Sequence, residues 1–460
     1  MTGTSNHSPA APPHWPALPP ALAGTAITAQ DSGYAAARSS YMAVGSPQLV
    51  FKARTEEHVQ QAVLYAAQVR VRTGERIPFS VRSGGHGISG MSTNSGGIIL
   101  DLSGLRAFEL LDPESGTFRV EAGATWGQIA SALAANDLVI SSGNFGDTGV
   151  GGLATAGGIG YFGRAQGLTL DAMIRARLVT ADGEVRWVDD THEPELFWAV
   201  RGGATQAGIA TAFDFKATAL DSVPGNSRIL HQQLTYVSRN LASFTAEWGQ
   251  WMREAPDQME SFLTIQALGD GQHAIQARNV WAGDDAMAAR PILQAAMEIA
   301  QVHDEHTQAV PYPLIVPTPN TPHVGQQRIQ MRDVLVDVAD EELGAALADS
   351  LGQRGTLLAE LRGLGGAIAR VPADATAWGN RHQEVLAGTW MHPLQMAEQD
   401  AAFAPLQQLG TGTYGAYSSD IRQDAAALAW PGATGRKLIE ISEQVDPQLL
   451  FDRGLTLRQH

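Results

Sequence analysis

The sequence predicts an α+β protein of two domains, because of its length and two patterns along the chain. Its 460 residues exceed one ordinary domain. From about residue 47 short apolar strands alternate with helical patterns, and near residue 221 the character changes to longer strands and amphipathic helices. We expect a first domain at 25–222, a second at 223–424 and a C-terminal segment, 425–460, that returns to the first domain. A disordered lead rich in Pro and Ala is expected at 1–24.

Apolar periodicity and turn residues predict the elements of the first domain. After the strand QLVFKA, Thr55 is placed to cap a helix whose apolar residues recur at helical spacing from Val59 to Ala67. A hairpin is expected around Asp182 and Gly183. Further strands are expected at IPFSVRS, GGIILDLS, TFRVEAG and IATAFDFKAT, and a helix at WGQIASALAAN.

The same reasoning predicts the rest of the chain. The Pro-rich stretch 311–322 is expected to be a loop, and the run from His303 to His306 a solvated patch at a helix end. Strands are expected at 226–238, 260–279, 355–371 and 383–390, and helices near 240–253, 285–302, 398–409 and within 431–451.

Composition and charge exclude several classes of function. A net charge of -16 repels a polyanion, which argues against nucleic-acid and anionic-membrane partners. The chain has no cysteine, so disulfides, thiolate zinc sites and cysteine nucleophiles are absent, and no metal site is expected. The first residues have no basic and apolar signal-peptide pattern, and no apolar run reaches about 18 residues. We therefore expect a cytoplasmic protein.

The strongest motif is RSGGHG at 82–87, directly after a predicted strand. Successive glycines permit positive φ and let several backbone N–H groups turn toward one phosphate. A histidine in such a turn, here His86, lies beside whatever the turn binds. The alternative is a glycine hairpin with an incidental surface histidine.

A second glycine cluster extends over 143–163. So many glycines fit a main chain that packs against a flat or phosphate-bearing ligand, whereas a plain surface loop of this length is uncommon. Gly158, Gly160 and Gly163 also satisfy GxGxxG, with Asp182 about twenty residues on. However, the motif follows another glycine run rather than a strand, and Asp182 lies in an Asp-Gly turn, which argues against a nicotinamide-binding domain.

Together these motifs resemble a known family. The chain is similar to the FAD-linked, p-cresol methylhydroxylase-type oxidoreductases of the vanillyl-alcohol oxidase superfamily, in the berberine bridge enzyme-like branch with 6-hydroxynicotine oxidases and oligosaccharide oxidases. The resemblance implies a two-domain fold, a cofactor domain plus a substrate domain on an antiparallel sheet. It rests on ordered segments from about 45 to 455, among them VRSGGHGISG, VEAGATWGQI, TGVGGLATAGGIGYFGRAQGLTLDAM, ELFWAVRGG, LGGAIARVPADATAW and VDPQLLF.

The resemblance also implies how FAD is held. The family's histidine of RSGGH bonds to the flavin ring, which implies a covalent link at His86. Members with two covalent links carry a cysteine where Phe145 stands, so a single link is implied. Thr148 matches the position beside the flavin that gates dioxygen. The other residues implied to contact FAD are Arg82, Ser83, Gly84, Gly85, Gly87, Gly149, Gly151, Gly152, Gly157, Gly158, Gly160 and Gly208.

Several motif positions depart from the family pattern. The family's RGGGGNFG is RGGATQAG at 201–208, its Asp-Asn is Asp171-Ala172, and its Tyr-x-Asn is Tyr414-Gly415-Ala416. The catalytic glutamate of the plant enzymes corresponds to Thr389. These changes alter flavin-side contacts and remove one base.

Three residues are candidates for the base. Glu360 and Arg362 share one face of a strand, since strand side chains alternate. Tyr414 and Tyr417 lie where the family places tyrosines near the flavin. We expect Tyr414 to be the base with Glu360 assisting, Arg362 lowering the tyrosine pKa, and Tyr417 as the other candidate.

The resemblance implies an FAD-dependent oxidase that passes hydride from a small alcohol or amine to the flavin, which dioxygen reoxidises to give hydrogen peroxide. One alternative is a flavin-dependent cyclase or oxygenase of secondary metabolism. Another is a flavin-binding protein that has lost catalysis.

Overall fold

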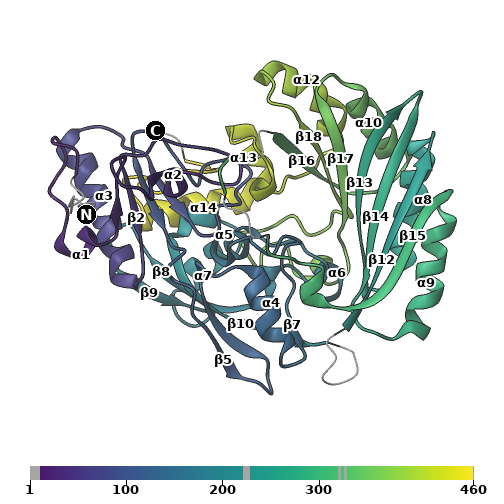
Figure 1. Ribbon diagram of the computed structural model, residues 1–460, viewed down its shortest axis with the longest axis horizontal. Coiled ribbons are helices and arrows are strands. Elements are labelled where there is room, and N and C mark those ends of the chain that lie inside the picture. The colour runs from purple at the N-terminus through teal and green to yellow at the C-terminus, as the bar shows by residue number, and fades with distance from the viewer. Residues whose placement is uncertain (1–10, 221–227, 320–322, 326–328, 459–460) are drawn as a thin grey trace, which may run out of the picture.

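The computed structural model describes residues 11–220, 228–319, 323–325 and 329–458. Figure 1 shows two lobes. One lobe holds the N-terminal half together with the last helices, and the other is built on one large sheet. The fold is the expected α+β arrangement of a cofactor domain and an antiparallel-sheet domain. The expected boundary at 222/223 lies outside the described residues, so the domain limits stay a prediction.

A small sheet at the N-terminal end of the first lobe positions the first glycine motif. Its strands run in the order β1-β2-β4-β3, with β2, β3 and β4 parallel. The bounds are β1 Ala26–Ile27, β2 Leu49–Lys52, β3 Phe79–Arg82 and β4 Ile98–Asp101. Helix α3, Glu56–Thr73, begins as predicted, with the Thr55 side chain accepting a hydrogen bond from the His58 N–H.

A second, antiparallel sheet in this lobe carries the other glycine-rich segments. Its strand order is β5-β6-β10-β8-β9, and the hairpin around Asp182 and Gly183 joins β8 to β9. The strands are β5 Phe108–Asp112, β6 Thr117–Glu121, β8 Met173–Val179, β9 Val185–Val188 and β10 Ile209–Lys216, and a separate pair consists of β7 Leu138–Val139 and β11 Thr218–Ala219. The helices of this lobe are α1 Pro20–Ala23, α2 Tyr34–Ala37, α4 Trp126–Ala134, α5 Val150–Ala156, α6 Gly163–Gln166 and α7 Pro194–Val200, with 3-10 turns at Thr169–Ala172 and Ala204–Ala207.

The second lobe is a seven-stranded antiparallel sheet in the order β15-β12-β14-β13-β17-β18-β16. The strands are β12 Arg228–Ser238, β13 Met259–Gly269, β14 Gln272–Trp281, β15 Val302–Pro311, β16 Gln330–Val336, β17 Thr356–Gly363 and β18 Val385–Met391. The helices are α8 Leu241–Glu254, α9 Ala286–Glu298, α10 Glu341–Gly352, α11 Ala367–Arg370 and α12 Met396–Gln407, with 3-10 turns at Tyr312–Leu314 and Gly415–Tyr417.

The two faces of this sheet have different neighbours. Helices α8, α9 and α10 pack on one face through an apolar cluster that includes Leu263, Trp248 and Leu347. Phe262 and Leu386 lie in another cluster, together with aromatic residues of the glycine-rich segment. The face of the sheet that carries Phe262 is therefore opposite the helices and is directed at the first lobe (Figure 1).

The C-terminal segment returns to the first lobe. Helices α13, Gln423–Ala429, and α14, Gly432–Val445, are the yellow helices that lie among blue elements in Figure 1. Leu438, Ile441 and Phe451 are buried in the core of that lobe.

Some expectations need correction. The expected disordered lead is ordered where it is described, since Trp15 is buried and the Tyr65 hydroxyl donates to the Pro16 carbonyl; residues 1–10 lie outside the described residues. Residues 364–371 do not continue strand β17, because Gly365 and Gly366 have positive φ and α11 follows. His303 and His306 lie exposed on edge strand β15, not at a helix end. Strands β15 and β16 and helix α10 were not predicted.

Candidate active site

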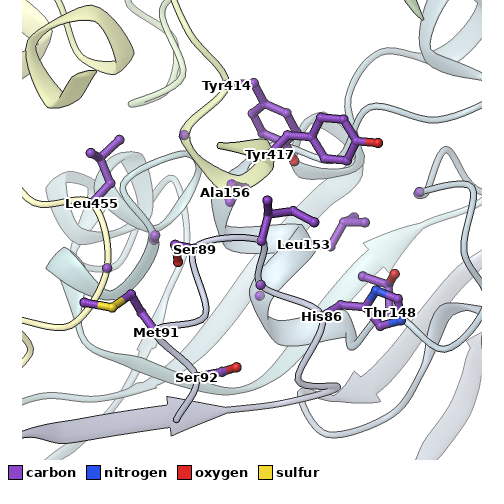
Figure 2. Close-up of a pocket in the computed structure, with 18 of the residues that line it drawn as sticks. His86, Ser89, Met91, Ser92, Thr148, Leu153, Ala156, Tyr414, Tyr417 and Leu455 are labelled. Atoms are coloured by element: carbon purple, nitrogen blue, oxygen red, sulfur yellow. The ribbon is translucent and has the colours of Figure 1, made fainter. Parts of the chain in front are cut away.

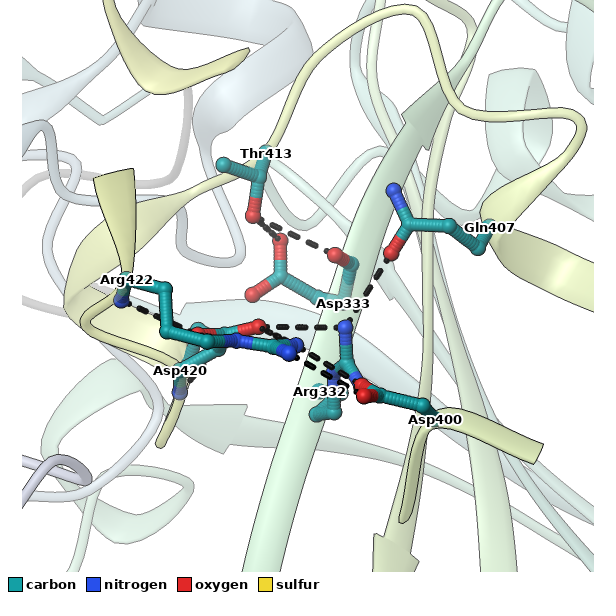
Figure 3. Close-up of polar contacts among 8 residues, drawn as sticks. Arg332, Asp333, Asp400, Gln407, Thr413, Asp420 and Arg422 are labelled. Atoms are coloured by element: carbon teal, nitrogen blue, oxygen red, sulfur yellow. Dashed lines mark hydrogen bonds and ion pairs between the residues drawn. The ribbon is translucent and has the colours of Figure 1, made fainter. Parts of the chain in front are cut away.

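A cavity of about 310 Å³ opens where the first lobe faces the Tyr414 loop and the sheet. Its wall combines residues from the segments 81–92, 143–159, which includes helix α5, 413–417 and 453–455. Figure 2 shows His86 and Thr148 on one side of this space and Tyr414 and Tyr417 on another. Segments far apart in the sequence thus meet around one cavity.

The first glycine motif is held by contacts behind the cavity wall. Arg82 ends β3 and donates to the Asp101 carboxylate at 2.7 Å and to the Ser39 carbonyl at 2.9 Å, so its charge is already paired. A Cβ on Gly84 would lie 2.3 Å from the backbone nitrogen of Gly149. The two glycine segments therefore touch main chain to main chain, which no other residue type permits there. Arg82, Ser83, Gly84, Gly85, His86 and Gly87 all line the cavity.

The second glycine cluster divides into two groups. Thr148, Gly149 and Gly152 line the cavity, and a Cβ on Gly152 would meet open space. The remaining predicted FAD contacts, Gly151, Gly157, Gly158, Gly160 and Gly208, are not among the lining residues.

Close packing or backbone conformation explains these five glycines instead. A Cβ on Gly160 would lie 1.2 Å from the Ser142 carbonyl oxygen, and one on Gly158 would lie 2.1 Å from Thr169 Oγ1. Gly208 has a φ of +124°, and β10 begins at the next residue. Such contacts admit no side chain, so these glycines shape the wall from behind.

His86 is fixed on several sides. The Tyr41 ring stacks on its imidazole with centroids 4.4 Å apart. His86 Nε2 lies 2.7 Å from Asp147 Oδ1, and His323 Nε2 lies 3.1 Å from Asp147 Oδ2. The Nε2–Oδ1 contact departs from ideal hydrogen-bond geometry, yet neither of these buried atoms has another partner among the described residues.

The Asp147 carboxylate stays ionised in this arrangement. Burial alone would raise its pKa, but the interactions with His323 and His86 outweigh burial and hold the pKa well below the usual range. The three residues also bring ligand atoms within 4.8 Å of one another, the spacing of a metal site. The carboxylate lies between the two imidazoles, so an N–H of each ring can point at one of its oxygens without any metal ion. The expectation that the protein has no metal site stays a prediction.

A tyrosine, a glutamate and an arginine meet at the opposite wall. The Tyr417 hydroxyl donates to Glu360 Oε2 at 2.8 Å and accepts from Arg362, whose guanidinium lies over the tyrosine ring. Glu360 and Arg362 do share the inner face of β17, and their ion pair measures 3.4 Å. Tyr417 and Arg362 line the cavity, whereas Glu360 lies behind them.

The structure revises the expected roles of the two tyrosines. The Tyr414 hydroxyl accepts from the Gly158 N–H at 3.0 Å and has no hydrogen bond to Glu360. Burial raises the pKa of Tyr414 to about 12, although Gly158 and Arg362 act in the opposite direction. Burial also raises the pKa of Tyr417 well above 10, against the effect of Arg362. The expectation that Glu360 assists Tyr414 is wrong in this geometry, because Glu360 and Arg362 both contact Tyr417.

Sequence reasoning missed several lining or supporting residues. His86 is surrounded by Asp147, Tyr41 and His323. The cavity is also lined by the aromatic side chains of Trp378 and Trp390. Asp147 lies inside the glycine cluster, so a lone acid among glycines was an available signal. His323 directly follows the Pro-rich stretch 311–322, and nothing in its local sequence indicates a contact with His86.

The residues present fit a flavin nucleotide. Glycine backbones with room for a close ligand, aromatic and aliphatic side chains, and a histidine against the wall suit a flat ring and a diphosphate. Figure 2 shows Ser92 and Tyr417 well apart along the lining, which suits a ligand longer than a single ring.

Comparisons with known proteins agree with this fit. Residues 47–189 match the model of the FAD binding domain. Over this part, the chain is similar to FAD-linked oxidoreductases. It is 34% identical over 197 residues to (R)-6-hydroxynicotine oxidase of Paenarthrobacter nicotinovorans, which covers 42% of this chain and 42% of that one. It is 30% identical to xylooligosaccharide oxidase of Thermothelomyces thermophilus over 56% of this chain, so the aligned stretch spans about half of that relative's length, 52%.

The fold extends beyond the aligned stretches. Glucooligosaccharide oxidase from Acremonium strictum, described as holding a 6-S-cysteinyl, 8α-N1-histidyl FAD, superposes with a TM-score of 0.81 at 21% identity, over 96% of this chain and 98% of that one. The FAD-binding domain predicted from the motifs and the two-domain fold are thus confirmed. Within the described residues, no helix has the length and apolar character needed to cross a bilayer.

Proposed function

We propose that this protein is an FAD-dependent oxidase that removes hydride from a small organic alcohol or amine and passes the electrons to dioxygen. The observation that carries the proposal is the Tyr417–Glu360–Arg362 group: Tyr417 and Arg362 line the cavity across from His86, and Glu360 lies behind them in contact with the Tyr417 hydroxyl. A proton acceptor on one side and a redox ring on the other is the arrangement that alcohol or amine oxidation needs. We further propose that the protein acts in the cytoplasm.

FAD would be held by backbone and by one covalent bond. The lining residues of 82–87 and 148–152 would contact the cofactor, and His86 would carry the link. Because the chain has no cysteine, a second link of the cysteinyl kind is excluded. The flavin, when bound, supplies the hydride acceptor.

The proton path uses residues of this chain. A substrate hydroxyl or amine that hydrogen-bonds to Tyr417 Oη can release its proton there, as the Tyr417 proton moves to Glu360 Oε2, 2.8 Å away. The Glu360 side chain is 19% exposed, which gives the proton a route to solvent. Arg362 keeps the negative charge at the phenol oxygen low in energy while the proton moves. This relay needs no free tyrosinate in the resting protein.

Oxygen reactivity depends on space beside the flavin. Thr148 lines the cavity and follows Asp147 in the second glycine cluster. Its small side chain leaves more room than a larger aliphatic residue would, which supports an oxidase over a dehydrogenase. Reoxidation in air no faster than free reduced flavin, with rapid turnover on quinones, would assign a dehydrogenase.

The proposal is tested in two steps. First, acid-precipitated and washed protein should stay yellow, and a tryptic peptide that contains His86 should carry the FAD mass. Second, alcohols, aminated heterocycles and oligosaccharides should be screened for anaerobic bleaching of the flavin and for peroxide release in air. Bleaching by none of these classes would argue for a protein without oxidase chemistry, and product analysis would reveal a cyclase or oxygenase.

A further inference from the structure

The immediate surroundings of His86 distinguish its two ring nitrogens. Nε2 lies 2.7 Å from Asp147 Oδ1, its nearest polar neighbour, although the contact is bent away from ideal hydrogen-bond geometry, and no side chain in the described part of the chain hydrogen-bonds to Nδ1. A histidine nitrogen next to an ionised carboxylate carries the proton, because N–H donates to the carboxylate and a lone pair would be repelled by it. The other nitrogen, Nδ1, then holds a free lone pair. This tautomer is the one in which Nδ1 is a nucleophile.

The carboxylate is itself held in place. His323 Nε2 contacts the second oxygen of Asp147 at 3.1 Å, so both oxygens face an imidazole. The Asp147 side chain is 13% exposed and that of His323 is 17% exposed, so water competes little for these contacts. Tyr41 stacks on the ring of His86, and the His323 ring meets it edge-on with centroids 5.0 Å apart. The imidazole thus has one preferred orientation and one preferred tautomer.

We propose that Asp147, oriented by His323, fixes the proton of His86 on Nε2 and so presents Nδ1 as the atom that forms the bond to flavin. Asp147 and His323 are then positioning residues for covalent attachment, not for substrate oxidation. This inference rests on the covalent link in the proposed function and adds how the chain makes it.

Formation of the bond between His86 and the flavin is a two-electron oxidation, and dioxygen, the oxidant of the proposed function, can accept the electrons. The new N–C bond replaces one hydrogen of the methyl group at ring position 8 of the flavin. That hydrogen leaves as a proton, two electrons pass into the ring, and dioxygen takes them up as hydrogen peroxide. The imidazole keeps its Nε2 proton and becomes a cation when the Nδ1 lone pair is used. The Asp147 carboxylate stabilises that cation, as a carboxylate does for an imidazolium in hydrolases.

The test compares variants of the full-length protein produced without riboflavin and then mixed with FAD in air. The readout is the first-order rate at which flavin fluorescence becomes resistant to denaturing electrophoresis. Asp147→Asn keeps the size of the side chain but removes its negative charge. The new amide N–H can donate to His86 Nε2, which would move the imidazole proton to Nδ1. We expect attachment at least about tenfold slower, the scale of losses when a carboxylate partner of histidine is removed from metal sites. His323→Ala should give a smaller loss.

Two controls separate positioning from folding and binding. Asp189→Asn makes the same change in another Asp–His pair, with His192 at 3.0 Å, whose residues do not line the cavity, and it should attach FAD at the wild-type rate. In a His86→Ala background, where no bond can form, adding Asp147→Asn should leave the dissociation constant of FAD unchanged within about threefold.

Each outcome decides the matter. Attachment by Asp147→Asn at the wild-type rate would overturn the inference while leaving the covalent link intact. A loss of FAD affinity in the His86→Ala background as large as the loss in rate would also overturn it, since Asp147 would then act in binding. If the wild-type protein itself held no acid-stable flavin, the proposed link would fail and the inference with it.

Discussion

At the scale of single residues, the two tyrosines of the 413–417 loop differ in what their hydroxyls contact. The Tyr414 hydroxyl accepts from a backbone N–H, and its own backbone N–H donates to Asp333 at 2.7 Å. The Tyr417 hydroxyl lies between a guanidinium and a carboxylate. Only the second arrangement provides somewhere for a proton to go. Tyr414 is therefore placed to shape the cavity, and the contacts of Tyr417 support its proposed role in proton transfer.

The first prediction follows from this difference. Tyr417→Phe and Glu360→Gln should each slow anaerobic flavin reduction by about 10²–10⁴-fold, the usual effect of losing general-base catalysis. Tyr414→Phe, a matched loss of one hydroxyl in the same loop, should slow it by less than about tenfold. Stopped-flow measurement on variants with equal flavin content checks this. A larger loss in Tyr414→Phe than in Tyr417→Phe would restore Tyr414 as the base.

At the scale of secondary structure, the segment from 143 to 163 uses glycine for two physical reasons. Some glycines leave space at the cavity, as Gly152 does in α5. Others let two main chains approach, as Gly160 does beside the Ser142 carbonyl. The consequences of adding one methyl group are therefore different at the two kinds of position.

The second prediction concerns this contrast. Gly160→Ala should lower the melting temperature strongly or prevent folding, because its Cβ would lie 1.2 Å from a carbonyl oxygen. Gly152→Ala should keep the melting temperature of the flavin-free protein, since nothing lies within 4 Å of its Cβ, but should weaken FAD binding by occupying cofactor space. Thermal unfolding and FAD titration of both variants measure this. Unchanged FAD affinity in Gly152→Ala would mean that the cofactor lies elsewhere.

The C-terminal segment is an element of the first lobe although it comes last in sequence. The Trp430 indole donates to the Gly202 carbonyl at 3.0 Å, and Asp452 pairs with Arg70 at 2.9 Å. Arg453 and Leu455 reach the cavity wall. This segment therefore closes both the core and the cofactor site of a domain made mostly from the first half of the chain.

The third prediction is that a chain ending at Ala429 should lose flavin. Removing α14 exposes apolar core that includes Leu438, Ile441 and Phe451, and opens the cavity wall. The ratio of flavin to protein absorbance after purification measures the effect, with a chain shortened by only two residues as control. Far-ultraviolet circular dichroism separates unfolding from specific flavin loss. Full flavin content in a folded truncated chain would show that the C-terminal segment is dispensable for the site.

At the scale of the whole molecule, Arg164 joins the two lobes. It lies in α6 of the first lobe, is buried, and donates to the carbonyls of Met252, Ala255, Met259 and Leu364 in the second. The buried Glu260 carboxylate accepts from the Arg164 backbone N–H at 3.3 Å. Burial raises the pKa of Glu260 to about 8, although Arg164 acts in the opposite direction. At neutral pH this acid is therefore protonated in the folded protein.

The fourth prediction gives the sign of the resulting pH dependence. Unfolded glutamate releases its proton near pH 4.5, whereas the folded state holds it up to about pH 8. Between these values the folded state binds more protons, so raising the pH lowers stability, by at most about 1.4 kcal/mol per pH unit. Glu260→Gln should remove this slope, and exposed Glu443→Gln should keep it. Urea unfolding from pH 5 to 8 measures both. Parallel profiles for wild type and Glu260→Gln would show that Glu260 is ionised in the folded protein.

The sequence by itself determined the features that local physics controls. Apolar periodicity and the Thr55 cap predicted α3, and the Asp182-Gly183 turn predicted its hairpin, because these signals act within a few residues. The glycine motifs, through the family they resemble, predicted the FAD domain and the loop that holds His86.

Only the tertiary structure decided which side chains meet. Asp147 and His323 are 176 residues apart, and Tyr417 and Glu360 are 57 apart, so no local spacing reveals either pair. Strand pairing set Arg362 opposite Phe262 on the inner face, and the 413–417 loop, which follows helix α12, brought Tyr417 rather than Tyr414 to Arg362. A residue can act as a base only if it lies within hydrogen-bond distance of the proton that it takes up and can pass that proton on. Packing between elements sets those distances, and the neighbouring residues in the chain do not.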